Sequence, residues 1–253
     1  MPEIIEREES IEVRMELRIM SNQEAVSLIV PTRNEEQIVE KNLKLINDYL
    51  SGLFEKYEIV VSDYSKDKTP ELVKALSKNY PIQYAPVYEK GIGIGIRAGI
   101  EAARYDLLMV YPIDMSWDMK CIKTSFQKIL SNEGDVILGS RGVKDSVVKR
   151  PLKRKVFTNT YNILVNLFFG LNIRDTQCTS AFRKSRIIPF IDRLDSKTPF
   201  LQTQLLIHSK KNNLRIVEIP VVVNDTRTDS KVNPIGDGFS MFRELINEFY
   251  KLR

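Results

Sequence analysis

The chain has 253 residues, of which 43% are hydrophobic and 28% charged, and its formal net charge is +5. This length and composition fit one large globular domain, or a domain with a small appendage, and exclude a disordered chain. Two cysteines, Cys121 and Cys178, and one histidine, His208, are too few for a disulfide framework or for a zinc site held by sulfur and nitrogen. A hard cation held by oxygen ligands stays compatible with the sequence.

The N-terminal segment 1–24 is predicted to be an extension outside the main domain. It carries Glu3, Glu6 and Glu8 where a signal peptide would be basic and then apolar, so nothing in it directs secretion. The longest apolar stretch, residues 161–171, is too short to span a bilayer, which needs about 20 apolar residues. Any membrane contact is therefore expected to be peripheral.

Short apolar runs alternate with amphipathic segments through the first half of the chain. Strands are predicted at residues 26–31, 57–63, 82–87, 106–111 and 135–140, and helices at residues 34–50, 65–79, 91–105 and 118–130. Asn34 and Thr69 are placed to cap the first two helices. This alternation predicts an α/β fold with a mostly parallel, doubly wound sheet and flanking helices.

The second half is less regular. Helices are predicted at residues 156–169, 201–211 and 236–253 and a last strand at residues 215–223, with a polar stretch at residues 174–183. Two of these helices carry apolar stripes: Phe157, Tyr161, Leu164, Val165 and Phe168 in one, and Phe239, Phe242, Ile246 and Phe249 in the other. Such a stripe packs in a core or lies on an anionic membrane, and both interpretations stay open.

Positive charge gathers in residues 141–155, where seven basic residues stand against one acidic residue, Asp145. A charge run of this kind is a solvated loop or an anion site, and the sequence leaves both open. Polar residues also follow three predicted strands, at 31–36, 62–65 and 112–114. Ligands of open α/β sheets bind at the carboxyl ends of the strands, so these segments are the candidates for a site.

Seven segments together resemble the inverting family 2 glycosyltransferases, and most closely the dolichyl-phosphate mannose synthases and dolichyl-phosphate glucosyltransferases. They are residues 26–36, 58–69, 90–99, 110–117, 139–141, 175–183 and 230–231. The run from Asp175 to Cys178 with the following Phe182-Arg183 is the most specific of them. The resemblance implies a GT-A fold over residues 25–235, followed by the C-terminal amphipathic helix. It also implies an inverting glycosyltransferase that moves a hexose from UDP-glucose or GDP-mannose to a polyprenyl or dolichyl phosphate.

The resemblance assigns a donor side to the strand ends. The nucleotide sugar is expected at Pro31, Arg33, Glu35, Asp63, Lys90, Gly91, Arg97 and Asp114. Carboxylates suit the hydrogen-bond donors of a base or ribose. The glycines at 91, 93 and 95 are spaced as GxGxG, so they make no dinucleotide fingerprint, and they are expected to allow close backbone approach to the ligand. Mg or Mn is expected at Asp114, although Pro112 replaces the first aspartate of the family's Asp-x-Asp motif, which leaves the metal requirement open.

The acceptor side is implied by the basic patch and the residues after it. The acceptor phosphate is expected at Arg141, Arg150, Arg154, Asn159 and Lys231. The resemblance implies that the catalytic residues are Asp114, Arg141, Asp175 and Gln177. Cys178 is expected to be a packed residue and His208 a structural or surface residue.

Ser62, Pro112, Gln202 and Gln204 stand where the family carries carboxylates, so two alternatives remain. The chain is a glycosyltransferase with a non-lipid acceptor, or a non-catalytic nucleotide-sugar-binding protein of the same fold. The main interpretation places it in the cytoplasm, peripheral at the cytoplasmic face of a membrane, with a membrane-anchoring partner possible. Nucleic-acid binding is not expected, because no binding module is recognisable.

Overall fold

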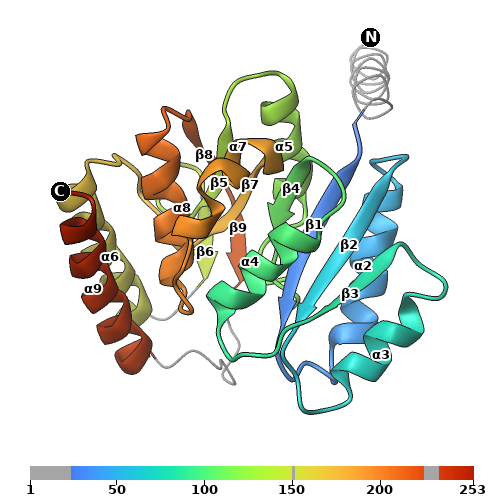
Figure 1. Ribbon diagram of the computed structural model, residues 1–253. Helices are drawn as coiled ribbons and strands as arrows, with labels where there is room; N and C mark the ends of the chain where they lie inside the picture. Colours follow the sequence, from blue (N-terminus) through green and yellow to red (C-terminus); the bar gives the residue numbers. More distant parts are fainter. Residues whose placement is uncertain (1–23, 150–151, 225–233) are drawn as a thin grey trace, which may run out of the picture.

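The computed structural model describes residues 24–149, 152–224 and 234–253, and of residues 152–157 and 234–239 it describes the backbone alone. A central sheet of seven strands runs in the order β3-β2-β1-β4-β7-β5-β8, and β6 pairs with β9 in a small second sheet (Figure 1). The strands are β1 (Val26–Thr32), β2 (Tyr57–Asp63), β3 (Ile82–Pro86), β4 (Leu107–Val110), β5 (Val136–Ser140), β6 (Val147–Lys149), β7 (Thr179–Arg183), β8 (Ile216–Pro220) and β9 (Val222–Asn224).

Helices cover both faces of the sheet, and α4 crosses one face in front of β1 (Figure 1). The helices are α2 (Val39–Ser51), α3 (Thr69–Leu76), α4 (Ile92–Ala102), α5 (Lys120–Leu130), α6 (Leu152–Phe169), α7 (Lys184–Ile187), the 3-10 helix η1 (Ile188–Arg193), α8 (Phe200–Lys211) and α9 (Pro234–Lys251). The predicted mostly parallel, doubly wound α/β fold is confirmed. Strands buried on both faces read as nearly continuous apolar runs, which is why β1, β2 and β4 were predictable.

Two strands were not predicted from the sequence, the short β6 and β7. Strand β7 lies antiparallel between β4 and β5, so it is central in the sheet. The five residues of β7 include Thr179, Ser180 and Arg183. A buried strand with so many polar residues is not predicted from hydrophobic periodicity. The predicted strand 215–223 is also corrected, since it divides into β8 and β9.

Both predicted helix caps are wrong. Helix α2 begins at Val39, and Asn34, at a φ of 54°, accepts a 2.8 Å hydrogen bond from the backbone N–H of Lys66. Thr69 accepts a 2.8 Å bond from the N–H of Glu35 in place of one from its own helix. The loops after β1 and β2 thus use these side chains to bind each other, and this tertiary demand overrides local capping.

The apolar stripe of α6 belongs to the core where its side chains are described. Tyr161 and Val165 are buried, and Phe168 packs against Phe249 of α9 with ring centroids 5.0 Å apart. The side chains of Phe157 and Phe239 lie outside the described residues. Helices α6 and α9 lie side by side at one end of the sheet (Figure 1). Among the described residues, no helix is long and apolar enough to cross a membrane. The division into segments 1–24, 25–235 and 236–253 stays a prediction.

Candidate active site

The donor side of the candidate site begins where β1 and β2 end next to each other. The parallel register pairs Pro31 with Ser62 and Thr32 with Asp63. The Asp63 carboxylate is buried and accepts hydroxyl hydrogen bonds from Thr32 at 2.7 Å and Ser65 at 2.5 Å. The Tyr84 hydroxyl lies 3.5 Å from its second oxygen. Partial burial and the nearby Asp63 charge raise the pKa of Tyr84, so Tyr84 stays a neutral donor.

Arg33 and Glu35 lie in the loop that follows Pro31, at the same edge of the sheet. Arg33 is exposed and Glu35 half-buried. The buried Thr69 hydroxyl holds the backbone of Glu35, and the Asp67 carboxylate accepts the N–H groups of Glu36 at 3.2 Å and Thr69 at 3.0 Å. The structure therefore places Pro31, Arg33, Glu35 and Asp63 at one edge of the sheet. That this edge binds the donor stays a prediction.

Gly91 and the glycines after it make a different contact from the one expected. A Cβ at Gly91 would meet the carbonyl oxygen of Lys197 at 2.3 Å, and one at Gly93 would meet that of Ser196 at 2.2 Å. A Cβ at Gly99 would meet Ile29 Cγ2 of β1 at 2.3 Å. These glycines are needed because α4 packs closely against β1 and the loop before α8. The expected backbone approach to a ligand stays a prediction.

Of the two predicted cations near these glycines, Lys90 is exposed in the loop between β3 and α4. Arg97 is not brought to the site by the structure. Its guanidinium pairs with Glu101 and Asp192, both at 2.8 Å, and lies 3.4 Å from the Leu194 carbonyl. Arg97 thus joins α4 to η1, since its donors are committed to this surface ion-pair cluster.

Asp114 follows β4 in a short turn after Pro112. Its carboxylate accepts the backbone N–H of Ser116 at 3.0 Å. No cluster of three or more metal-binding side chains occurs among the described residues. One carboxylate oxygen is a hard donor, and such a donor set fits a cation that takes its remaining ligands from a diphosphate and water.

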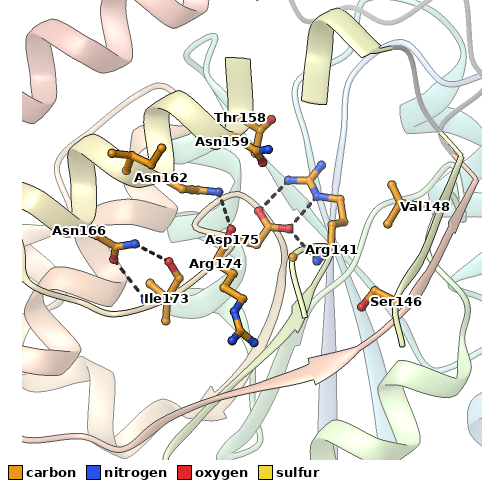
Figure 2. A pocket seen from close by; sticks show the side chains of 12 residues that line it. Arg141, Ser146, Val148, Thr158, Asn159, Asn162, Asn166, Ile173, Arg174 and Asp175 are labelled. Atoms are coloured by element: carbon orange, nitrogen blue, oxygen red, sulfur yellow. Dashed lines mark hydrogen bonds and ion pairs between the residues drawn. The ribbon is translucent and has the colours of Figure 1, made fainter. Parts of the chain in front are cut away.

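Arg141 and Asp175 form the most strongly bonded pair of the site (Figure 2). Arg141 Nε and Nη2 donate to the two Asp175 oxygens at 2.7 and 2.8 Å, and Nη2 also donates to the Gln177 carbonyl at 2.5 Å. The Asp175 side chain is 1% exposed and that of Arg141 15%. The Arg141 guanidinium carbon lies 5.2 Å from the centre of the Trp117 ring, so the pair borders the loop that carries Asp114.

An open pocket of about 770 Å³ lies beside this pair (Figure 2). Its lining includes Arg141, Asp175 and the predicted acceptor residue Asn159. Arginine, amide and hydroxyl groups are the donors that bind phosphate in proteins. Arg150 and Lys231 lie outside the described residues, and of Arg154 only the backbone in α6 is described.

Gln177 and the residues around it are tied to α8. The Gln177 side chain donates to Thr203 at 2.9 Å, and the Gln202 side chain donates to the Cys178 carbonyl at 3.2 Å. Burial raises the pKa of the Cys178 thiol well above its ordinary value, which agrees with a packed residue. Gln204 is buried and bonds to Glu248 of α9 at 3.1 Å.

His208 is structural, as expected. It is buried, lies 3.0 Å from Glu248 and stacks on Phe190 with centroids 5.9 Å apart.

Sequence reasoning missed Asn162, Asn166 and Arg174, which also line the pocket. The two asparagines donate to the backbone carbonyls of Arg174 and Ile173 (Figure 2), and Asn162 also accepts the N–H of Thr176. Their one signal in the sequence was a spacing of four residues within the otherwise apolar run 161–169, which places both on one helix face.

A protein-family model described as Glycosyl transferase family 2 matches residues 27–189. Among curated proteins, glycosyltransferase AglD of Haloferax volcanii is 28% identical over 90% of this chain, which spans 37% of that relative. Dolichyl-phosphate beta-glucosyltransferase ALG5A of Trichomonas vaginalis is 28% identical over 79% of this chain, which spans 66% of it. A dolichyl-phosphate hexose transferase of Haloferax volcanii is 23% identical, with 87% of this chain and 92% of the relative covered.

Among solved structures, glucosyl-3-phosphoglycerate synthase from Mycobacterium tuberculosis in complex with UDP superimposes with a TM-score of 0.68 at 14% identity, covering 92% of this chain and 83% of that one. The same enzyme with Mn²⁺, UDP and glucosyl-3-phosphoglycerate gives a TM-score of 0.63 at 15% identity, with 91% and 80% covered. The predicted GT-A fold is therefore confirmed.

Proposed function

The chain belongs to glycosyl transferase family 2, and we propose that it is a glycosyltransferase that moves a hexose from a nucleotide sugar to a polyprenyl phosphate, with inversion at the sugar carbon. The observation that carries the choice of acceptor is the Arg141–Asp175 pair at the side of an open pocket rich in amide and hydroxyl groups. The relatives named as dolichyl-phosphate transferases support the same choice.

The donor nucleotide binds along the edge formed by Pro31, Arg33, Glu35 and Asp63. Three hydroxyls orient the buried Asp63 carboxylate, which leaves it acceptor capacity, because a carboxylate has about four lone-pair sites. A fixed carboxylate of this kind accepts N–H or O–H groups of a base or ribose. Lys90 and Gly91, just before α4, are proposed as further donor contacts.

The acceptor phosphate needs no strong base in this mechanism. The second pKa of a phosphate monoester is about 6, so the group is already anionic at neutral pH. One of its oxygens attacks the anomeric carbon, the bond from that carbon to the diphosphate oxygen breaks, and the electron pair leaves with the nucleoside diphosphate. Attack opposite to the leaving group inverts the carbon.

Positive charge is what this reaction requires from the protein, because two anions must approach each other. Arg141 supplies it beside the pocket, and Asp175 fixes the direction of its guanidinium. Asn159 adds an amide on the α6 side, and Arg150, Arg154 and Lys231 are proposed to extend the positive charge. Gln177 contributes its backbone carbonyl, which accepts a hydrogen bond from Arg141.

Asp114 is the residue proposed to hold Mg²⁺ or Mn²⁺ through the donor diphosphate. The cation, when bound, offsets the negative charge that develops on the leaving diphosphate. Magnesium habitually takes few protein ligands together with phosphate oxygens and water, so a single carboxylate suits it.

The acceptor lipid implies that the protein works at a membrane surface. We assign this contact to the basic segment 141–155, since clustered Lys and Arg residues bind anionic headgroups. The proposed site is the cytoplasmic face, with contact through this segment or through a membrane-anchoring partner.

The test is transfer of radiolabelled sugar from UDP-glucose, UDP-N-acetylglucosamine and GDP-mannose, with and without Mg²⁺ or Mn²⁺. One arm offers a short polyprenyl phosphate, and a second offers 3-phosphoglycerate, the acceptor type in the solved Mycobacterium enzyme. Lipid-linked product that is lost in Arg141→Ala but kept in Arg186→Ala, an exposed arginine of α7, supports the proposal. Product in the second arm alone identifies a non-lipid acceptor. Donor binding without product in either arm identifies a non-catalytic binding protein.

A further inference from the structure

Helix α6 carries a pair of asparagines that hold the loop containing Asp175, and nothing in the proposed mechanism uses them. We propose that Asn162 and Asn166 are positioning residues for sugar transfer. They fix residues 173–176 so that Asp175 aims the Arg141 guanidinium at the acceptor anion. This inference rests on the proposed function, and it assigns to α6 a part in the reaction beyond lining the pocket.

Asn162 brackets Asp175 on both sides. Its Nδ2 donates to the carbonyl of Arg174 at 2.6 Å, and its Oδ1 accepts the Thr176 hydroxyl at 2.8 Å and the Thr176 N–H at 3.2 Å. Asn162 is 4% exposed and Thr176 1%. Hydrogen bonds to the residues just before and just after Asp175 leave its backbone little freedom to rotate.

Asn166 extends this hold by one helical turn. Its Nδ2 donates to the carbonyl of Ile173 at 2.7 Å, and its Oδ1 accepts the N–H of the same residue at 3.2 Å. Both side chains point from α6 toward the loop in Figure 2. Two amides on one helix face, four residues apart, thus bind three residues of the loop, Ile173 and Arg174 before Asp175 and Thr176 after it.

The loop 173–176 in turn fixes Arg141 through Asp175. Besides the two side-chain bonds, Asp175 Oδ2 accepts the backbone N–H of Arg141 at 3.0 Å, so three bonds from Arg141 depend on where this carboxylate lies. A planar guanidinium bonded at two points follows the orientation of its carboxylate. A misplacement of 1 Å in a reacting constellation lowers the rate up to about 100-fold.

A role in positioning differs from a role in stability, and the chain offers variants that separate the two. Asn162→Ala removes the side-chain hydrogen bonds to Arg174 and Thr176. Asn162→Asp keeps the Oδ1 acceptor for Thr176 but replaces the donor to Arg174 by an oxygen. Val165→Ala perturbs the same helix, since Val165 is fully buried, without touching the loop bonds. Asn247→Ala changes an exposed asparagine of α9.

Kinetics at a temperature below the unfolding of every variant gives the first test. Asn162→Ala and Asn162→Asp are expected to lower kcat about 10- to 100-fold, with the KM for the nucleotide sugar within about twofold. Val165→Ala is expected to lower the unfolding temperature and to leave kcat unchanged. Asn247→Ala is expected to change neither the unfolding temperature nor kcat. A kcat that follows unfolding temperature across all four variants overturns the inference.

Coupling to Arg141 gives the second test. In an Arg141→Lys background the guanidinium is gone, so Asn162→Ala is expected to lower kcat less than it does in the natural chain. An equal fold-loss in both backgrounds means that Asn162 does not act through Arg141, and the assignment fails.

A third measurement needs no activity and so separates this inference from the proposed function. The Arg141 Nε–H resonance, assigned by its loss in Arg141→Lys, is followed by ¹⁵N NMR in the full chain. It is expected to shift or broaden in Asn162→Ala and to stay in place in Val165→Ala. If the natural chain transfers no sugar but this pattern appears, the proposed function fails while the positioning geometry stands. An unchanged resonance in Asn162→Ala overturns the inference.

Discussion

Replacing Arg141 by alanine tests the electrostatic account of the site, because it leaves the Asp175 carboxylate without its cation. The substitution removes two side-chain bonds to Asp175, at 2.7 and 2.8 Å, and one to the Gln177 carbonyl. The carboxylate is 1% exposed. It keeps the backbone N–H groups of residue 141 at 3.0 Å and of Gln177 at 3.2 Å.

The expected cost follows from these numbers. Removing one partner of a buried ion pair costs about 3–5 kcal/mol of unfolding free energy. Here the two backbone donors remain and the neighbouring pocket admits water, so we expect about 2–3 kcal/mol. For a chain of this size that lowers the unfolding temperature by roughly 4–12 °C.

The assay is urea unfolding followed by tryptophan fluorescence. Trp117 is the single tryptophan of the chain, and its ring centre lies 5.2 Å from the Arg141 guanidinium carbon. Arg186→Ala is the matched control, because its exposed pair with Asp135 is expected to contribute less than about 1 kcal/mol.

The double variant Arg141→Ala/Asp175→Ala distinguishes an unpaired charge from lost packing. With the carboxylate gone, it is expected to be more stable than Arg141→Ala alone, as double-mutant cycles of buried pairs require. An Arg141→Ala variant within about 0.5 kcal/mol of the natural chain would refute the reasoning, as would a double variant whose loss equals the sum of the single losses.

Three further predictions concern the metal, the packing of α4 and the acid stability. Asp114→Asn is expected to abolish the stimulation of sugar transfer by Mg²⁺ or Mn²⁺, measured as rate against metal concentration; retained stimulation places the cation elsewhere. Gly93→Ala puts a Cβ 2.2 Å from a loop carbonyl and should lower the unfolding free energy by about 1–3 kcal/mol, whereas the roomier Gly52→Ala should not. Burial alone raises the pKa of Glu248, but hydrogen bonds from α8 lower it below 4.5. The ionised Glu248 therefore stabilises the fold fully above about pH 4.5, and this contribution is lost as the pH falls through its pKa in the folded chain. Glu248→Gln should make the free energy of unfolding depend less on pH in acid.

Much of the fold was predictable because its strands are buried on both faces. Residues 26–32 and 57–63 need apolar side chains on both sides of the sheet, and such runs are visible in a sequence. The order of the motifs also indicated the family. Of the matching residues, Pro31 and Asp63 lie at neighbouring strand ends, and Arg141 and Asp175 pair with each other.

Local rules failed where distant segments compete for the same group. Asn34 and Thr69 have the composition of helix caps, yet each bonds to the other loop, 32 and 34 residues away along the chain. Gly91, Gly93 and Gly99 were expected to approach a ligand, and the structure shows that each also leaves room for a neighbouring segment of the chain. Arg97 resembles a phosphate contact, but Asp192 is folded next to it.

The sequence by itself determined which residues form the buried strands and which chemical groups follow them, because hydrophobic period and residue type are local properties. The tertiary structure decided which of those groups meet. A polar strand, β7, became central only because β4 and β5 leave two rows of backbone groups for it to pair with. Asn162 and Asn166 became part of the site only because α6 crosses the loop before β7. Hydrogen bonds act over about 3 Å, so partners that are far apart in the chain are chosen by packing in space and not by their spacing in sequence.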